Sequence, residues 1–160
     1  MAMLDICCGD GWFTAAAATL TGAPLAGLDL DPAMLAEAET MCKEANVTFI
    51  EGDAMALGTL TPGPFDFVLI ANTFHGVADQ PALAATVASV LNPGGRFVIV
   101  GWHKRPREDT SVLGAPRGPA QISRMSPGET ARAVEAGGLM LTQIVDLPPY
   151  HYGAVFTADS

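Results

Sequence analysis

An acid, two glycines and a helix start lie close together near the beginning of the chain. The stretch reads Leu4-Asp5-Ile6-Cys7-Cys8-Gly9-Asp10-Gly11-Trp12-Phe13-Thr14 and continues into an alanine-rich segment. Gly9 and Gly11 let the backbone approach a ligand without a Cβ in the way, and the helix start behind them offers unpaired N–H groups. The stretch therefore predicts a strand, a nucleotide-binding turn and a helix.

A second acid lies at a distance that suits a nucleotide. Asp29 follows Gly9 by about twenty residues, the spacing of a ribose-binding acid in a dinucleotide-binding dehydrogenase. The third glycine of that fingerprint would stand at position 14, where this chain has Thr14. Because that glycine permits close packing of helix on strand, the threonine argues against NAD binding.

The elements that must position these residues follow from apolar runs, caps and turn residues. Strands are expected near residues 4–6, 25–30, 47–50, 65–71, 96–101, 139–147 and 150–157. Helices are expected over residues 12–20, after Asp31-Pro32, from residue 79 or 80 to Asn92, and from Ser126 to Gly137. Residues 54–64 leave room for a short helix at best, and residues 104–125 are expected to form an irregular loop.

The connections between these elements predict the fold class. Only prolines separate the last two strands, so these strands must be antiparallel neighbours, whereas helices separate the earlier strands and favour parallel pairing. We expect an α/β fold with a doubly wound seven-stranded sheet, in which six strands are parallel and the last is antiparallel. Helices should cover both faces, and residues 1–160 should form a single domain.

Composition narrows the function further. The net charge of −9 argues against a nucleic-acid partner, because neutralising phosphates needs a positive surface. No apolar run reaches the length of a membrane span and no signal-like segment begins the chain, so a cytoplasmic protein is expected. Cys7, Cys8 and Cys42 form neither a disulfide framework nor a zinc spacing, and we interpret them as buried thiols.

Five motifs in order carry a family resemblance. They are Asp5-Ile6-Cys7-Cys8-Gly9-Asp10-Gly11, Gly27-Leu28-Asp29-Leu30-Asp31-Pro32-Ala33-Met34-Leu35, Glu51-Gly52-Asp53-Ala54, Phe65-Asp66-Phe67-Val68-Leu69-Ile70-Ala71-Asn72-Thr73-Phe74-His75 and Leu91-Asn92-Pro93-Gly94-Gly95-Arg96. From Leu4 to about Thr157 the chain resembles class I S-adenosylmethionine-dependent methyltransferases, in particular the type 11 or ubiquinone/menaquinone methyltransferase-like group.

The resemblance implies roles for residues at the strand ends. Asp29 would accept hydrogen bonds from both ribose hydroxyls of S-adenosylmethionine, Asp53 would accept one from the adenine amino group, and Asp5 would orient the methionine amino group through water. The full set of implied cofactor-binding residues is Asp5, Cys7, Gly9, Gly11, Asp29, Leu30, Gly52, Asp53, Ala54, Ala71 and Asn72.

The chain departs from the family pattern at two places. Cys7 stands where the family usually has glycine, which we interpret as a tolerated substitution. Members of the group usually carry one or two helices before the first strand, whereas only Met1-Ala2-Met3 precede Leu4. The pocket is therefore expected to be more open, or to be closed by a partner chain, for which a homodimer is one option, or by residues 104–125.

Three histidines are candidates for chemistry. With the family's strand order, His75, His103 and His151 all fall at the carboxyl edge of the sheet, together with Tyr150. His75 is the candidate catalytic base, because imidazole titrates near neutral pH, and His103, Tyr150 and His151 are candidate substrate residues. Polar rim residues without a catalytic role, or a metal site of three imidazoles, are the alternatives, and no metal is expected.

Basic residues gather in one segment. Five of the eight Lys and Arg residues fall within 104–125. The segment is either a solvated loop or a surface that recruits an anionic substrate, with Arg105 and Arg107 as the residues to test. We therefore expect a methyltransferase acting on oxygen or carbon, less readily on nitrogen, of a small and possibly anionic molecule. The alternatives are a cofactor-binding module that needs a partner, and an NAD-binding protein.

Overall fold

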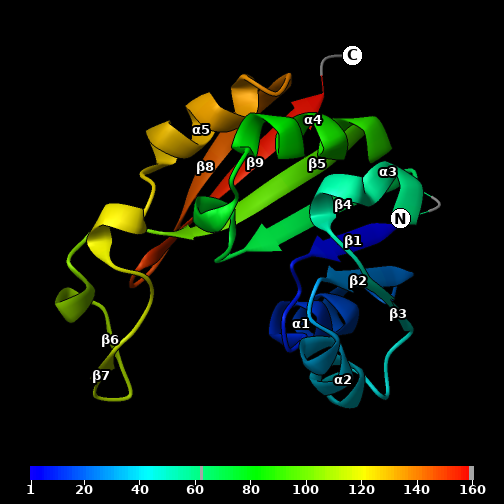
Figure 1. Cartoon of the computed structure of the whole chain (residues 1–160), viewed down its shortest axis with the longest axis horizontal. Helices are drawn as coiled ribbons and strands as arrows, with labels where there is room; N and C mark the ends of the chain where they lie inside the picture. The colour runs from blue at the N-terminus through cyan, green and yellow to red at the C-terminus, as the bar shows by residue number, and fades with distance from the viewer. Residues whose placement is uncertain (62, 159–160) are drawn as a thin grey trace.

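A seven-stranded sheet runs through the computed structural model, which describes residues 1–61 and 63–158 (Figure 1). The strand order is β3-β2-β1-β4-β5-β9-β8. The strands are β1 (Met3–Ile6), β2 (Leu25–Asp29), β3 (Val47–Glu51), β4 (Phe65–Ala71), β5 (Leu91–Trp102), β8 (Leu139–Leu147) and β9 (His151–Ala158). Strand β9 pairs antiparallel with both β5 and β8, and the other pairs are parallel. The predicted fold class and the reversed last strand are confirmed.

Five helices connect the strands, and three of them begin at side-chain caps. The helices are α1 (Trp12–Thr21), α2 (Pro32–Met41), α3 (Leu57–Leu60), α4 (Gln80–Val90) and α5 (Pro127–Glu135) among the described residues. Asp31 and Asp79 accept from backbone N–H groups of α2 and α4, and each is followed by a proline in the first turn. Ser126 and Glu129 form a reciprocal capping box at α5. These caps confirm the predicted helix starts.

The hydrophobic core lies between the sheet and helices α4 and α5. Phe97 and Phe156 are opposite one another on β5 and β9 and have no exposed surface, and they pack with apolar residues of α4 and α5. Helices α1 and α2 lie on the opposite side, against β2 and β3 (Figure 1). The two helix layers therefore cover different halves of the sheet.

The second face of β5 and β9 is only half-covered. Val98 and Val155 are paired across these strands and are half-buried, although their neighbours Phe97 and Phe156 are fully buried. A cavity of about 330 Å³ opens on this face. Figure 1 shows α1 and α2 under β1–β3 and, in the part of the chain that is described, no helix under β5, β9 and β8.

Three boundaries differ from those expected. Strand β5 begins at Leu91 rather than residue 96, because Leu91 pairs with Phe65 before an irregularity in the register. Strand β9 begins at His151, because Tyr150 belongs to the proline turn. The segment 104–125 contains a two-stranded hairpin, β6 (Ser111–Val112) and β7 (Ala115–Pro116), and two 3-10 turns rather than irregular chain alone.

Candidate active site

The turn after β1 has the backbone shape that its residues demand. Cys7, Gly9 and Gly11 have φ angles of 56°, 55° and 85°, all in the left-handed region. A Cβ on Gly11 would lie 2.9 Å from the Cα of Ala38, whereas a Cβ on Gly9 would meet nothing within 4 Å. Gly11 therefore lets α1 approach α2, and the space beside Gly9 is open for a ligand. Cys7 takes a conformation that costs a non-glycine residue about 1–2 kcal/mol.

Asp29 connects the turn to the end of β2. Its Oδ2 accepts a hydrogen bond of 2.8 Å from the backbone N of Gly9, and its Oδ1 accepts one of 3.0 Å from the N of Asp31. A carboxylate offers about four lone-pair sites, so both oxygens keep acceptor capacity. Leu30, beside it, is 69% exposed. The geometry suits a carboxylate that binds two hydroxyl groups at the open side of the turn.

Asp53 occupies the corresponding place at the end of β3. Its Oδ1 accepts from the N of Met55 at 2.9 Å, while Ala54 is buried beneath it. Gly52 has a packing role, because a Cβ there would lie 2.4 Å from Cδ1 of Leu60. Asp5 lies within β1, Asp29 ends β2, and Asp53 follows the end of β3 by two residues, so the three acids belong to adjacent strands of the sheet.

Asp5 differs from the other two acids because it is buried. It is 2% exposed and accepts a hydrogen bond of 2.6 Å from Oγ1 of Thr14 in α1. Burial raises the pKa of its carboxyl to about 6, against the lowering effect of the Thr14 bond. Asp5 therefore fastens α1 to β1, and its predicted contribution to orienting a ligand amino group stays a prediction.

The cysteines of this region are unreactive by environment. Cys8 and Cys42 are buried, and burial raises the pKa of Cys7 to about 11 and that of Cys8 to about 12. Thiols with such pKa values remain protonated at neutral pH, and the thiolate is the reactive form. The interpretation of the three cysteines as buried thiols holds for Cys8 and Cys42, whereas Cys7 is half-buried.

A cavity of about 660 Å³ adjoins the turn. Trp12 and Phe13 of α1 line it, as do Val100 and Trp102 of β5 and residues of the segment 104–125 and of the β8–β9 turn. Apolar and aromatic walls with few polar groups are typical of small-molecule sites. The segment 104–125 therefore forms part of the wall of this cavity, which is one of the ways of closing the pocket that we expect from the sequence.

Two buried polar atoms in the lining have no hydrogen-bond partner within the described chain, Oδ1 of Asn72 and Nε2 of His151. Asn72 follows Ala71 at the end of β4, has a φ of 60° and is held by a backbone bond to Val100. Buried polar groups without partners are costly and call for an explanation. A polar ligand in the cavity would supply the missing partner.

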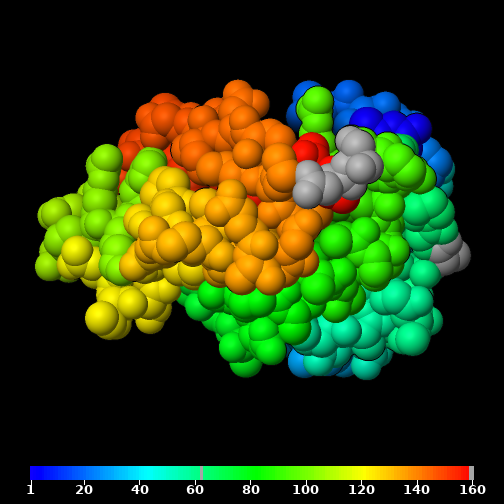
Figure 2. All heavy atoms as spheres, turned by 90° about the horizontal axis from the view of Figure 1, so that it is seen from above, coloured from blue at the N-terminus to red at the C-terminus, as the bar shows by residue number. Residues whose placement is uncertain are grey.

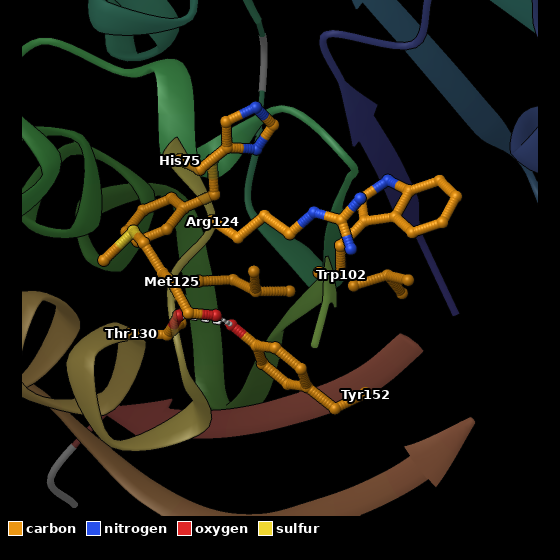
Figure 3. A pocket seen from close by; sticks show the side chains of 10 residues that line it. His75, Trp102, Arg124, Met125, Thr130 and Tyr152 are labelled. Atoms are coloured by element: carbon orange, nitrogen blue, oxygen red, sulfur yellow. Dashed lines mark hydrogen bonds between the residues drawn. The ribbon is translucent and has the colours of Figure 1, made fainter. Parts of the chain in front are cut away.

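His75 lies in a separate recess (Figure 3). This recess encloses about 10 Å³ between Phe74, Arg124, Met125, Thr130 and Tyr152, and a cavity of about 420 Å³ opens on the other side of His75. Burial and then the nearby charge of Arg124 lower the pKa of His75, so its imidazole is neutral at pH 7. The hydroxyl of Tyr152 is held by Thr130 at 2.6 Å and by the carbonyl of Met125 at 2.9 Å.

Arg124 separates the recess from the larger cavity. Its side chain is 2% exposed and runs past His75 to the indole of Trp102, with the guanidinium carbon 5.1 Å from the ring centroid (Figure 3). Its nitrogens donate to the carbonyls of residues 103, 117 and 119 and to Oγ1 of Thr110. The cation therefore holds several turns of the segment 104–125 against β5.

The other predicted substrate residues are placed around the segment rather than in one cavity. His103 contacts Asp146 through Nε2 at 2.9 Å, and the hydroxyl of Tyr150 donates to the carbonyl of Ser111 at 2.9 Å. Arg107 donates from Nε to the carbonyl of Gly118, and Arg105 is exposed. The three histidines that the sequence places at the carboxyl edge of the sheet therefore do not share one cavity: His151 lines the 660 Å³ cavity, His75 lines the recess, and His103 pairs with Asp146.

Sequence reasoning missed Arg124 and Arg117. Both were visible only as members of a basic cluster, and nothing in their spacing distinguishes the buried one from those in solvent. Trp12 and Phe13 were interpreted as the beginning of a helix, and their place in the cavity wall depends on how α1 leaves the turn.

The described residues contain no group of three or more His, Cys, Asp and Glu side chains that could hold a metal ion. Among the helices that the structure describes, none is both long and apolar enough to cross a membrane.

Comparison with known families shows to which family the chain belongs. The family described as "Methyltransferase domain" matches residues 3–95. A demethylmenaquinone methyltransferase of Lactococcus lactis is 34% identical over 105 residues, covering 62% of this chain and 41% of that protein. A ubiquinone biosynthesis O-methyltransferase of Methylobacterium sp. is 30% identical over 151 residues, covering 88% of this chain and 60% of the relative. The chain thus spans less than two thirds of the length of these relatives.

Solved structures share the fold. A SAM-dependent methyltransferase from Aquifex aeolicus superposes with a TM-score of 0.84 at 20% identity, covering 98% of this chain and 81% of the other. The glycopeptide N-methyltransferase MtfA in complex with S-adenosyl-L-methionine superposes with a TM-score of 0.79 at 18% identity, covering 99% and 82%. At such identities the likeness establishes the fold.

Proposed function

The chain belongs to the methyltransferase domain family, and from this premise we propose that it transfers a methyl group from S-adenosylmethionine to a small molecule in the 660 Å³ cavity. The observation that carries the proposal is the juxtaposition of the open turn at Gly9 with the strand-end acids and with this cavity. Fold alone would not assign an activity, because one fold hosts many functions.

The residues fit the cofactor. Asp29 has acceptor capacity for the ribose hydroxyls, Asp53 has a free carboxylate oxygen for the adenine amino group, and Gly9 leaves space for the amino-acid end. Asn72 lines the cavity, and its buried Oδ1 has no hydrogen-bond partner in the described chain. We extend the proposal to the remaining predicted residues, which lie in the turn after β1 or at or just after the ends of β2, β3 and β4: Cys7, Gly11, Leu30, Gly52, Ala54 and Ala71.

The cofactor supplies a methyl group on a positively charged sulfur, which a nucleophile attacks in line. The protein's part is to orient the nucleophile and to exclude water, and the aromatic walls at Trp12, Phe13 and Trp102 suit both tasks. His75 remains our candidate for the base, and its lowered pKa keeps it neutral and able to accept a proton at pH 7. Since Arg124 lies between His75 and the larger cavity and the recess encloses only about 10 Å³, His75 would have to accept the proton through one water molecule in the recess.

The acceptor is proposed to react at oxygen or carbon. The relatives named above are a demethylmenaquinone methyltransferase and a ubiquinone biosynthesis O-methyltransferase. A flat acceptor of that general kind would suit a cavity with two tryptophans in its wall. The family match, the reversed strand β9 and the buried Thr14 side chain argue against the NAD-binding alternative.

Calorimetric titration with S-adenosylmethionine and S-adenosylhomocysteine tests the proposal. We expect both to bind, and we expect Asp29→Asn to weaken binding about tenfold or more, because it removes charge-assisted bonds to the ribose. Glu37→Gln, which changes an exposed acid on α2, is the matched control and should bind as the unchanged protein does.

Absence of binding by the folded protein would contradict the proposal. Binding without product formation from any acceptor, together with a stable complex with another protein, would favour the alternative of a cofactor-binding module that needs a partner.

A further inference from the structure

The lining of the large cavity contains a basic side chain and no acidic one, although the protein as a whole is acidic. The chain carries a net charge of −9, yet among the eleven described residues that line this cavity Arg117 is the single charged side chain. No carboxylate of the described chain pairs with Arg117 within ion-pair distance. An unpaired cation beside aromatic walls is a feature that a ligand can use.

The backbone of Arg117 is fixed although its side chain is exposed. Its N donates to the carbonyl of Thr110 at 3.0 Å, and its carbonyl accepts from Oγ1 of Thr110 at 2.9 Å and from Nη2 of Arg124 at 3.1 Å. Gly118 follows with a φ of 81° and packs against Trp102, because a Cβ there would lie 2.8 Å from the indole. The position from which the Arg117 side chain extends is therefore determined by buried contacts.

Neighbouring basic residues differ in this respect. Arg107 already uses Nε to hold the carbonyl of Gly118, and Arg105 is not among the residues that line the cavity. The guanidinium of Arg124 is already hydrogen-bonded to the segment. Its buried charge lies behind the indole of Trp102, where it adds to the positive potential at the cavity wall. Among these four arginines, Arg117 alone combines a free guanidinium with a place in the cavity wall.

We propose that Arg117 determines specificity for an acceptor that carries an anionic group, such as a carboxylate, on an apolar ring body. The ring lies against Trp102 and the other aromatic walls, and the guanidinium binds the anion at the side formed by the segment 104–125. The inference rests on the proposed function, in that it names the substrate class of the same cavity, and it moves the expected role of Arg105 and Arg107 to Arg117.

Two fluorescent probes with related ring systems test the inference without a known acceptor. 1-Anilinonaphthalene-8-sulfonate carries an anionic group, and N-phenyl-1-naphthylamine lacks it. Energy transfer from tryptophan reports occupancy, because both tryptophans of the chain, Trp12 and Trp102, line this cavity. We expect Arg117→Gln to lower the affinity for the anionic probe about tenfold and to change the affinity for the neutral probe less than twofold.

Arg105→Gln is the control, since it removes the same charge from the same segment outside the cavity wall. The Arg105→Gln variant should bind both probes with an affinity within twofold of that of the unchanged protein. Added salt should weaken binding of the anionic probe more in the unchanged protein than in the Arg117→Gln variant. Equal weakening of both probes, or unchanged affinity for the anionic probe in Arg117→Gln, would overturn the inference.

Titration with S-adenosylhomocysteine, run on the same variants, separates the two proposals. If the cofactor product binds and the probes are not discriminated, the substrate class is wrong while the methyltransferase proposal stands. If the probes are discriminated and the cofactor product does not bind, the anion site stands and the proposed function falls.

Discussion

Asp5 is a buried acid whose ionisation opposes folding. Its pKa is raised from 3.8 to about 6 in the folded protein, chiefly by burial, so the folded state binds the proton more tightly than the unfolded state does. The stability contributed by the protonated form is complete below pH 4 and is lost as the pH rises to about 6. At pH 8 the folded protein therefore carries a destabilising carboxylate.

Asp5→Asn removes this titration while keeping an acceptor for Thr14. We expect the variant to unfold at higher denaturant concentration at pH 8, with a gain of about 1–2 kcal/mol, and to lose the decline in stability between pH 4 and pH 6. Chemical denaturation at several pH values measures both effects.

Asp66→Asn is the opposing control, because hydrogen bonds from Ala2 and Asn92 lower the pKa of Asp66. Its removal should reduce stability at pH 8. An Asp5→Asn variant that is less stable than the unchanged protein at pH 8 would show that the ionised carboxylate stabilises the folded state instead of opposing it.

At the level of the element, four hydrogen bonds from Arg124 join the turns of the segment 104–125. Arg124→Met keeps the apolar volume of the side chain and removes the hydrogen bonds that the guanidinium donates to the carbonyls of residues 103, 117 and 119. We expect amide hydrogens of residues 105–124 to exchange at least tenfold faster, since the segment packs beyond α5 at one end of the molecule (Figure 2).

Exchange in β4 and α4 should not change, because these elements pack in the core. Arg132→Met, on the exposed side of α5, should leave protection of the segment intact. Equal protection of the segment in the Arg124→Met variant would show that the hairpin and Tyr150 hold it without the arginine.

The starts of the helices could be predicted because the residues that cap a helix lie next to it in the sequence. Asp31-Pro32 and Ser126-Pro127 mark helix starts, and Asp29, which ends β2, lies two residues before Asp31. The order inside residues 104–125 could not be predicted, because it comes from a buried arginine that bonds to carbonyls up to 21 residues away. Composition alone made that segment look irregular.

At the scale of the whole molecule, the two faces of β5 and β9 should differ in their contribution to stability. Phe156 has no exposed surface and packs with α4 and α5, whereas Val155 on the other face is half-buried. We expect Phe156→Ala to cost about 3–5 kcal/mol and Val155→Ala to cost about 1 kcal/mol or less, measured by chemical denaturation. Similar losses would mean that the second face is covered in solution.

Some parts of the candidate site could be predicted from local sequence signals, and others depend on contacts between residues far apart in the sequence. Asp29, Asp53 and Gly9 were predictable because each ends a strand or follows it directly. The cavity was not, since its wall combines α1, β5, the segment 104–125 and the β8–β9 turn, and only the packed sheet brings these together. His75 was singled out by its position after β4, yet the side chain of Arg124 places it in a separate recess.

A crystal structure with S-adenosylhomocysteine bound tests the central claim most directly. The account predicts the ribose on Asp29, the adenine beside Asp53 and Ala54, and the sulfur at Asn72, directed into the cavity lined by Trp102. Binding of the compound anywhere else, with the turn at Gly9 unchanged and empty, would contradict it.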